Sequence, residues 1–189
     1  LDHAKNGTGT EAFSMVQNTV DHMLTGGIHD HIGGGFHRYA TESRWRVPHF
    51  EKMLYNQALM SVVLAQLYDD SGKTRYKHAL KRLLNYVSLN MTDGSGAFYS
   101  AQDAETDAVE GAYYVWNLKE LSSILVQDDF QFLMSIYSNA DIPEISGHKH
   151  PDGKVLYRAQ RIEDEGTQDN LDAIFAQLLS VRSKRKPPL

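Results

Sequence analysis

The stretch Gly-Gly-Ile-His-Asp-His-Ile-Gly-Gly-Gly-Phe-His-Arg-Tyr at residues 26–39 is the most informative part of the chain. Its fourteen residues hold five glycines, three histidines, one aspartate and one arginine. Ordering so many glycines costs conformational entropy, so a plain connector would not need them. Glycine suits positions where the backbone turns tightly or another group comes close. The stretch therefore predicts the floor of a site rather than a spacer.

The composition is that of an ordinary globular domain. The chain has 189 residues, a formal net charge of −5 and 41% hydrophobic residues, which suffices for one domain or for part of a larger one. Without a basic surplus, nucleic-acid binding is not expected. No apolar run is long enough to span a bilayer and no signal peptide is evident, so we expect no membrane partner and a cytoplasmic location. Cysteine is absent, which excludes disulfides and thiolate metal sites within these residues.

Helical periodicity dominates the chain. We expect a first helix capped by Thr10 and ended by Gly26, and a second that has Pro48 in its first turn and ends at residues 69–72. Further helices are expected around 76–87, from Asn117, over 128–137 and over 169–184. The predicted buried stripe of the second helix consists of Phe50, Met53/Leu54, Ala58, Val62 and Ala65. Short connections between helices favour antiparallel helical hairpins, and hence an all-α toroid over a regular repeat array.

The remaining segments predict short strands and loops. Residues 97–100 and 112–116 are aromatic and strand-like, and they flank an acidic loop over 102–111. A further short strand is expected over 154–157, and a loop over 142–151. The basic run at 182–186 is expected to be a solvated helix end, because cations suit a helix C-terminus.

The glycine-rich stretch carries the first candidate site. His37 and Arg38 would serve as a proton-transfer group and an anion clamp. In the alternative interpretation, His37 bonds a carbonyl and Arg38 pairs with a surface carboxylate. A metal bound by His29 and His31 is disfavoured, because no third ligand is evident, and Asp30 would instead hold a neighbouring histidine in one tautomer. The glycines lack the lysine and hydroxyl residue of a phosphate-binding loop.

The second helix and the acidic loop carry further candidates. Glu51 and Tyr55 share one face of the expected helix, although Glu51 could equally face water and pair with Tyr55 or Lys52. Paired carboxylates in the acidic loop would suit glycoside chemistry, whereas a merely solvated loop is the alternative. Trp116 and its neighbouring tyrosines would either stack on sugar rings or form the core of a hairpin.

Several blocks carry a family resemblance. Residues 26–39, 45–58, 98–105, 110–116 and 181–188 resemble the spermatogenesis-associated protein 20/YyaL family of thioredoxin-domain-containing proteins. The resemblance implies a thioredoxin-like domain joined to an (α/α)6 toroid similar to N-acylglucosamine 2-epimerases and six-hairpin glycosidases. Residues 1–189 would be the N-terminal part of that toroid domain, with a small β-hairpin insertion. The thioredoxin-like domain and the rest of the toroid would be absent, in agreement with the missing cysteines.

The resemblance implies a sugar-active toroid, in which an epimerase or isomerase moves a proton next to a carbonyl. The catalytic candidates are His37, Arg38, Glu51, Asp103 and Glu105. The substrate-binding candidates are Asp30, His31, His49, Tyr55, Gln57, Glu110 and Trp116. No metal or cofactor is expected. In the epimerases an arginine on the matching helix polarises the carbonyl oxygen. The corresponding zone of this chain is residues 55–59, which contain no arginine.

Two alternatives remain open beside the epimerase. An inverting hydrolase would use two carboxylates drawn from Glu51, Asp103 and Glu105, about 6.5–9.5 Å apart. A non-enzymatic domain would serve as a scaffold for the thioredoxin-like domain. The expected partners are a small sugar or derivative, the thioredoxin-like domain and the remaining toroid helices. By itself the chain is expected to be inactive and to expose an apolar patch.

Overall fold

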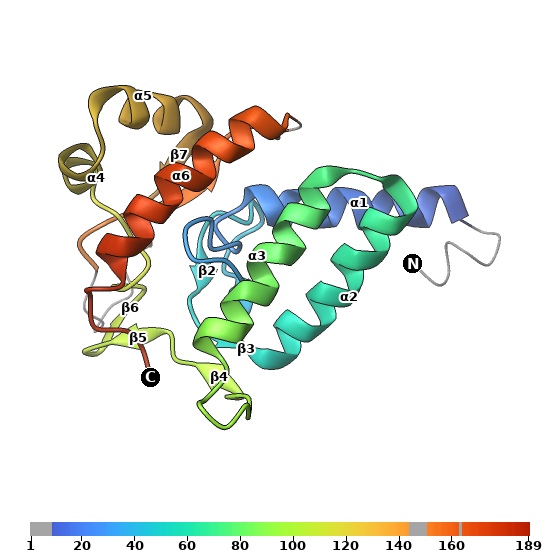
Figure 1. Ribbon diagram of the computed structural model, residues 1–189, viewed down its shortest axis with the longest axis horizontal. Helices are drawn as coiled ribbons and strands as arrows, with labels where there is room; N and C mark the ends of the chain where they lie inside the picture. Colours follow the sequence, from blue (N-terminus) through green and yellow to red (C-terminus); the bar gives the residue numbers. More distant parts are fainter. Residues whose placement is uncertain (1–8, 144–150, 163) are drawn as a thin grey trace.

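The computed structural model describes residues 9–143, 151–162 and 164–189. The described part of the chain is a helical fold with small antiparallel strand pairs (Figure 1). Its helices are α1 (Gly9–Thr25), α2 (Leu54–Ser71), α3 (Thr74–Asn90), α4 (Leu118–Ile124), α5 (Gln127–Ile136) and α6 (Glu165–Arg182). The strands are β1 (Tyr39–Ala40), β2 (Pro48–His49), β3 (Lys52–Met53), β4 (Ala101–Gln102), β5 (Glu105–Thr106), β6 (Val109–Glu110), β7 (Tyr137–Ala140) and β8 (Val155–Arg158).

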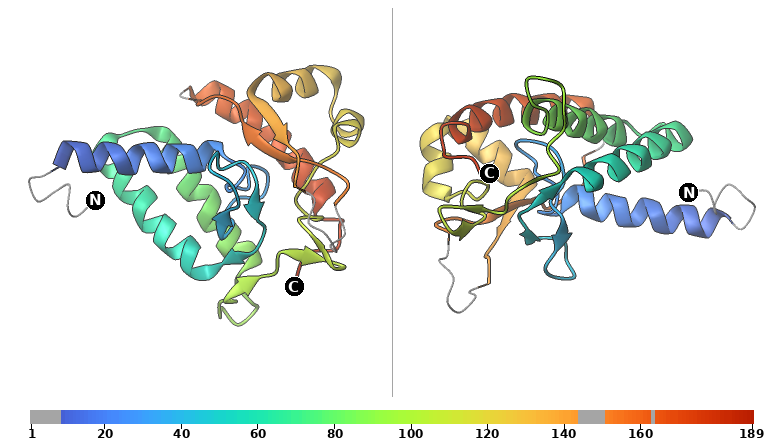
Figure 2. Two further views of the ribbon diagram at one scale, coloured as in Figure 1. Left: turned by 180° about the vertical axis from the view of Figure 1, so that it is seen from behind. Right: turned by 90° about the horizontal axis from the view of Figure 1, so that it is seen from below.

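The helices form two groups, and the glycine-rich loop (residues 26–39) lies between them (Figures 1 and 2). In Figures 1 and 2, α1, α2 and α3 lie together on one side, and α4, α5 and α6 lie on the other with β7 and β8. The first group packs around Val20, Leu64, Leu67, Tyr76 and Leu83. The second has its own core, which includes Trp116, Leu133, Leu171, Phe175 and Leu178. A third, smaller cluster around Phe50, Tyr114 and Val155 joins the connecting segments.

Several sequence predictions are confirmed. The first helix ends at Thr25, just before Gly26, although it begins at Gly9, so that Thr10 lies within the helix and not at its cap. Asn117 caps α4 by accepting a hydrogen bond from the backbone N–H of Lys119. The strand expected over 154–157 is present as β8, which pairs with β7. The helix expected from residue 169 begins four residues earlier, at Glu165, where the Asp164 side chain caps it.

The predicted start of the second helix is wrong. Pro48 does not open a helix but lies in β2, where it pairs with Ala40. Lys52 and Met53 then pair with β4, and α2 begins only at Leu54. Proline has no backbone N–H to donate within a helix or between strands, and it is tolerated in the extended backbone of a short edge strand. Glu51 therefore does not share a helix face with Tyr55.

The predicted buried stripe of this helix is wrong except for Phe50, which is buried but precedes α2. The buried residues of α2 are Gln57, Leu64 and Leu67. Tyr55, Leu59 and Val62, at i, i+4 and i+7, are 49%, 66% and 56% exposed. They form an exposed apolar face of α2. The prediction failed because apolar residues lie on both sides of this helix, so that periodicity alone could not identify the buried side.

The aromatic segment 112–116 is not a strand but a series of turns that ends in a single bridge between Trp116 and Lys154. Residues 97–100 contribute a bridge from Phe98 to Thr92, and the regular strand β4 follows them. The expected acidic loop contains a hairpin of its own, formed by β5 and β6. The fifth helix stops at Ile136, and Tyr137 opens β7. Most of the loop expected over 142–151 lies outside the described residues.

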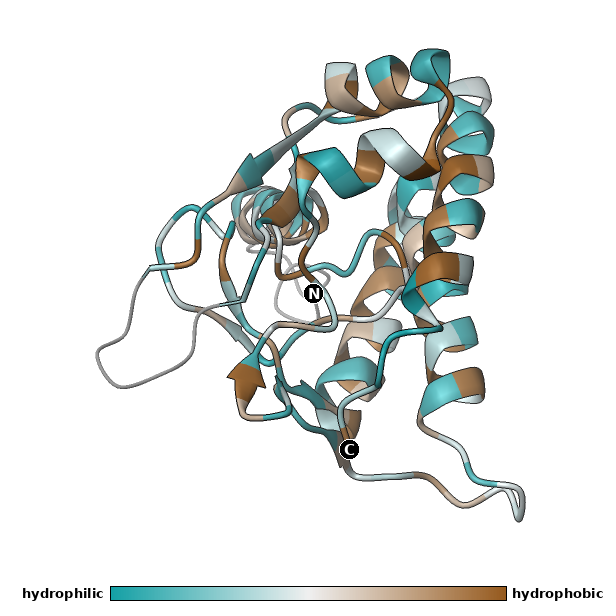
Figure 3. Ribbon diagram, turned by 90° about the vertical axis from the view of Figure 1, so that its left-hand side faces the viewer, coloured by the Kyte–Doolittle hydropathy of each residue, from teal (hydrophilic) through white to brown (hydrophobic). Residues whose placement is uncertain are grey.

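Apolar and polar residues alternate along the helices, as the hydropathy colours of Figure 3 show. No helix in the described part of the chain has the length and apolar character needed to cross a bilayer.

Candidate functional site

The centre of the molecule holds a buried ion cluster that consists of Asp30, Lys52 and Arg182. Arg182 donates one hydrogen bond of 2.9 Å to each carboxylate oxygen of Asp30. Lys52 Nζ donates to the same carboxylate at 2.8 Å and to the carbonyl of Gly34 at 2.8 Å. The backbone N–H groups of Ile32 and Gly33 also donate to Asp30. The Asp30 cluster thus joins the glycine-rich loop, β3 and the end of α6.

The cluster is almost completely removed from water. The side chains of Lys52, Asp30 and Arg182 are 0%, 4% and 4% exposed. Burial opposes ionisation of Asp30, but Arg182 and Lys52 outweigh it and hold the pKa of the carboxyl well below its usual value. Burial lowers the pKa of Lys52 to about 8, although Asp30 partly offsets that effect. At neutral pH the cluster therefore holds two cations against one anion.

Two sequence predictions are corrected here. The basic run at 182–186 is not simply a solvated helix end, because Arg182 is buried on Asp30 and Arg185 donates to Glu120 while lying over the Trp116 ring. Asp30 does not hold a neighbouring histidine in one tautomer, because its hydrogen bonds come from Lys52, Arg182 and the backbone.

The glycines of the stretch let other elements come close, as the sequence predicted. Gly34 and Gly35 have φ values of 82° and 75°, which favour glycine. A Cβ on Gly34 would lie 2.5 Å from the carbonyl oxygen of Arg82, and one on Gly35 would lie 2.6 Å from the ring of Tyr86. The glycine-rich loop is therefore pressed directly against α3.

A cleft of about 330 Å³ lies beside the Asp30 cluster, between α3 and α6. Tyr86 and Tyr114 line it, and their hydroxyl groups each donate a hydrogen bond of 2.9 Å to the side-chain oxygen of Gln102. Lys52 lies 4.1 Å from the centre of the Tyr86 ring and 5.0 Å from that of Tyr114. The other polar residues of its lining are Arg82, Asn85, Asn90, Tyr113, Arg182 and Ser183.

His37, the principal catalytic candidate, is buried and bonded to the backbone. Its Nδ1 lies 2.8 Å from the carbonyl oxygen of Phe50, and its ring packs edge-on against Phe50 and Tyr114. Burial, with a contribution from Lys52, lowers the pKa of His37 to about 3. The neutral ring therefore donates from Nδ1 to Phe50. The cavity that it lines measures about 20 Å³, which is room for a water molecule and not for a sugar.

Besides Asp30, three of the substrate-binding candidates lie inside the fold. His31 Nε2 lies 2.9 Å from the carbonyl of Gly26, and its Nδ1 lies 3.1 Å from the hydroxyl of Tyr137. The Gln57 amide accepts from the N–H of Phe36 and donates to its carbonyl. Trp116 is 1% exposed within the second core. These side chains tie the interior together, and none of them lines the 330 Å³ cleft.

Other candidates form a chain of close polar contacts near the surface. Arg38 donates to Glu51 at 2.8 Å, and His49 Nε2 lies 3.8 Å from the same carboxylate. On its other side, His49 Nδ1 lies 2.7 Å from Glu110. The surface carboxylate that the alternative interpretation assigned to Arg38 is thus Glu51.

The remaining candidates are solvent-exposed. Asp103 lies between β4 and the β5–β6 hairpin, whereas Glu105 is the first residue of β5, and Asp103 accepts a hydrogen bond from the Glu105 backbone N–H. Tyr55 belongs to the exposed apolar face of α2. Neither carboxylate lines the cleft. In the described residues, no three His, Asp or Glu side chains are grouped so that they could hold a metal ion.

Sequence reasoning missed Lys52, Tyr86 and Arg182 as components of the central site. Each lies in a segment whose local pattern explains it otherwise: a charged residue beside Glu51, an aromatic on α3 and a cation at a helix end. Their common partner Asp30 is 22 residues from Lys52 and 152 from Arg182, so no local spacing links them.

The comparisons with known proteins agree with the resemblance. No family model matches the chain. It is 39% identical over 170 residues to spermatogenesis-associated protein 20 of Mus musculus and of Homo sapiens, which covers 82% of this chain and 22% of each relative. An uncharacterized protein of Caenorhabditis elegans is 41% identical over 126 residues, or 61% of this chain and 17% of that protein. The chain thus spans about a fifth of the length of the curated relatives it matches. On this similarity, the chain belongs to the spermatogenesis-associated protein 20 family.

Proposed function

We propose that this chain is part of an (α/α)6 toroid and that it binds a small sugar or sugar derivative in the cleft between α3 and α6. The cleft measures about 330 Å³, within the range of small-molecule sites. Its walls combine aromatic rings with amide and cationic side chains, which suit the apolar faces and the hydroxyl groups of a sugar ring.

The orientation of Gln102 is the observation that carries this proposal. Both Tyr86 and Tyr114 donate to its side-chain oxygen, and burial raises the pKa of each phenol well above its usual value. The two hydroxyls therefore stay protonated and fix the amide. Its two N–H groups, which have no partner among the described residues, are left to donate to ligand oxygens.

Epimerisation or isomerisation is the reaction proposed for this site, by proton transfer next to a carbonyl. Lys52 is a better proton-transfer candidate than His37, because its pKa of about 8 lies near neutral pH whereas that of His37 is about 3. Lys52 also lies in the wall of the large cleft, beneath Tyr86 and Tyr114. Because Lys52 is fully buried, a substrate reaches it only when one of these rings moves.

Binding of monosaccharides and sugar phosphates tests the proposal, in this chain and in a full-length relative with matching substitutions. We expect at least one compound to raise the melting temperature saturably. Gln102→Leu removes the N–H donors and should weaken that binding at least tenfold, whereas Gln177→Leu on the exposed side of α6 should leave it unchanged. Saturable binding that is equal in both variants, or no binding at all, would contradict a sugar site in this cleft.

A scaffold role is the second candidate, and the structure offers a specific observation for it. His31, His37 and Gln57 make hydrogen bonds to backbone groups in a filled interior. Three acidic residues of 102–111 are exposed to solvent, namely Asp103, Glu105 and Asp107. The exposed apolar face of α2 would then receive the remaining toroid helices or the thioredoxin-like domain proposed as partners. A full-length relative that binds no sugar but loses solubility after Leu59→Asp and Val62→Asp would favour the scaffold.

A further inference from the structure

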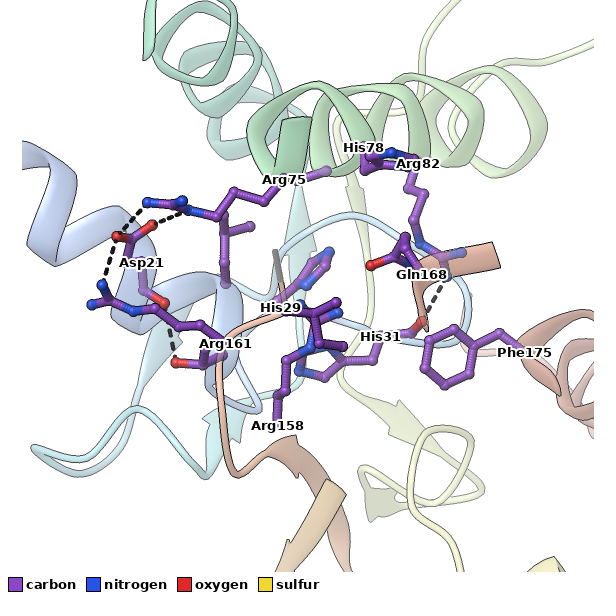
Figure 4. A pocket seen from close by; sticks show the side chains of 14 residues that line it. Asp21, His29, His31, Arg75, His78, Arg82, Arg158, Arg161, Gln168 and Phe175 are labelled. Carbon is purple, nitrogen blue, oxygen red and sulfur yellow. Dashed lines mark hydrogen bonds and ion pairs between the residues drawn. The ribbon is translucent and has the colours of Figure 1, made fainter. Parts of the chain in front are cut away.

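A second pocket lies between α1, α3, the end of β8 and α6, and it is drawn in Figure 4. Its volume is about 30 Å³, against the roughly 10–15 Å³ that one water molecule requires. His29 lies near the centre of the view, with Asp21, Arg75 and Arg161 to one side of it and Arg82, Gln168 and Phe175 to the other. The pocket is distinct from the cleft beside Gln102, although Arg82 contributes to the walls of both.

The pocket carries an excess of positive charge. Four arginines line it (Arg75, Arg82, Arg158 and Arg161). Among the described residues, the lining holds one carboxylate, that of Asp21, which accepts two hydrogen bonds of 2.9 Å from Arg75 and lies 3.2 Å from Arg161.

The other two arginines are less well neutralised. Arg82 lies 3.1 Å from Asp172, outside the lining, and also donates to the carbonyls of His31 and Ile32. Arg158 donates to the hydroxyl of Tyr137 and has no carboxylate partner among the described residues. Among the described residues, one carboxylate, that of Asp172, thus lies against the two guanidinium groups on this side of the pocket, which leaves a net positive charge there.

His29 adds a buried polar group without a partner. Both of its ring nitrogens are buried and lack a partner at normal hydrogen-bond geometry within the described residues, and the Leu24 backbone lies close enough to oppose only slightly the fall in the pKa of the ring. Burial, followed by the charges of Arg82 and Arg158, lowers the pKa of His29 to about 3. The ring is therefore neutral and keeps one N–H donor. Leaving such a donor unpaired in the interior is costly.

We propose that this pocket binds one small oxyanion of the phosphate class, held by the guanidinium groups of Arg82 and Arg158 and by the His29 N–H, which turns toward the anion when it binds. An oxyanion supplies what the lining lacks, because it neutralises the excess cations and accepts from the orphaned imidazole. The volume suits a single anionic group and not a sugar ring. The bound anion would stabilise the contact between the two groups of helices, since its ligands come from the glycine-rich loop, α3 and β8.

Thermal unfolding of this chain at constant ionic strength, with inorganic phosphate or chloride added, tests the proposal. Phosphate should raise the melting temperature saturably, whereas chloride should not. Gln168→Glu places a negative charge in the lining, and Ala176→Glu places the same charge on an exposed part of α6 as the matched control. We expect phosphate affinity to fall at least tenfold in the first variant and to change less than twofold in the second.

Proton NMR of the imidazoles gives a readout that is independent of stability. Phosphate should shift the His29 ring signals along a saturable curve and leave those of the exposed His22 unchanged. Glucose 6-phosphate and glucose then distinguish the source of the anion. Tighter binding of the sugar phosphate indicates a ligand-borne phosphate, and equal binding indicates free phosphate. No saturable effect of phosphate, an equal effect of chloride, or equal losses in Q168E and A176E would overturn the proposal.

Discussion

Asp30 and Arg182, 152 positions apart in the chain, share two parallel hydrogen bonds of 2.9 Å in an interior from which water is excluded. Lys52 approaches the same carboxylate at 2.8 Å. The pair connects the glycine-rich loop to the end of α6 and so holds the two groups of helices together. Because a buried charge is tolerated only with its partner, removing one member of the pair leaves the others uncompensated.

Arg182→Met should therefore destabilise the fold strongly. We expect the free energy of unfolding, measured by urea denaturation, to fall by about 3–5 kcal/mol, the usual cost of breaking a buried ion pair. Arg44→Met, at an exposed position, should change it by less than about 0.5 kcal/mol. A loss in R182M no larger than in R44M would show that Lys52 alone satisfies Asp30.

Acidification should destabilise the protein before any carboxylate of the Asp30 cluster is protonated. His29 and His37 have an ordinary pKa of 6.5 and a folded-state pKa of about 3, so the unfolded chain binds more protons between these values. Stability is therefore lost as the pH falls below 6.5, by about 2 kcal/mol for each histidine on going to pH 5. Denaturant titrations at several pH values should show a shallower slope for His37→Gln and an unchanged slope for the exposed His22→Gln. A flat profile between pH 7 and 5 would mean that these histidines are protonated in the folded state.

Mild alkali should have the opposite effect through Lys52. Its pKa falls from 10.5 to about 8 on folding, so between these values the unfolded state binds more protons and stability rises with pH. The rise should amount to about 2 kcal/mol between pH 7.5 and 9.5, because loss of the proton leaves one cation against one anion in the cluster. Urea denaturation of Lys52→Met should not show this rise, whereas the exposed variant Lys81→Met should keep it. Identical profiles for K52M and the unmodified chain would refute the assignment.

The close approach of the glycine-rich loop to α3 should be visible in a pair of glycine substitutions. Gly35 and Gly72 both have positive φ, at 75° and 66°, but an added Cβ meets the Tyr86 ring at Gly35 and nothing within 4 Å at Gly72. Gly72→Ala should cost about 1–2 kcal/mol of unfolding free energy from backbone strain alone. Gly35→Ala should cost a further 1–3 kcal/mol or so from overpacking against the ring. Equal losses in the two variants would mean that Tyr86 moves aside freely.

Much of the secondary structure could be predicted from local patterns. The ends of α1 and α2, the Asn117 cap and β8 follow from glycine placement, capping chemistry and apolar spacing, which depend on residues a few positions apart. The conformation of the segment around Pro48 could not be predicted in this way. Its extended backbone is fixed by strand pairing, of Pro48 with Ala40 and of Lys52 with Gln102. The buried face of α2 also escaped prediction, since apolar residues occupy both of its sides and the neighbour on one side decides which is covered.

The amino-acid sequence by itself determined a helical chain, a glycine-rich loop able to admit close neighbours and membership of a known family. The tertiary structure decided that Asp30 binds Lys52 and Arg182, that His37 faces a carbonyl, and that Arg38 pairs with Glu51 at the surface. The reason is physical. Hydrogen bonds and side-chain periodicity within a helix are local, whereas the burial and the partners of a charge depend on segments that only folding brings together.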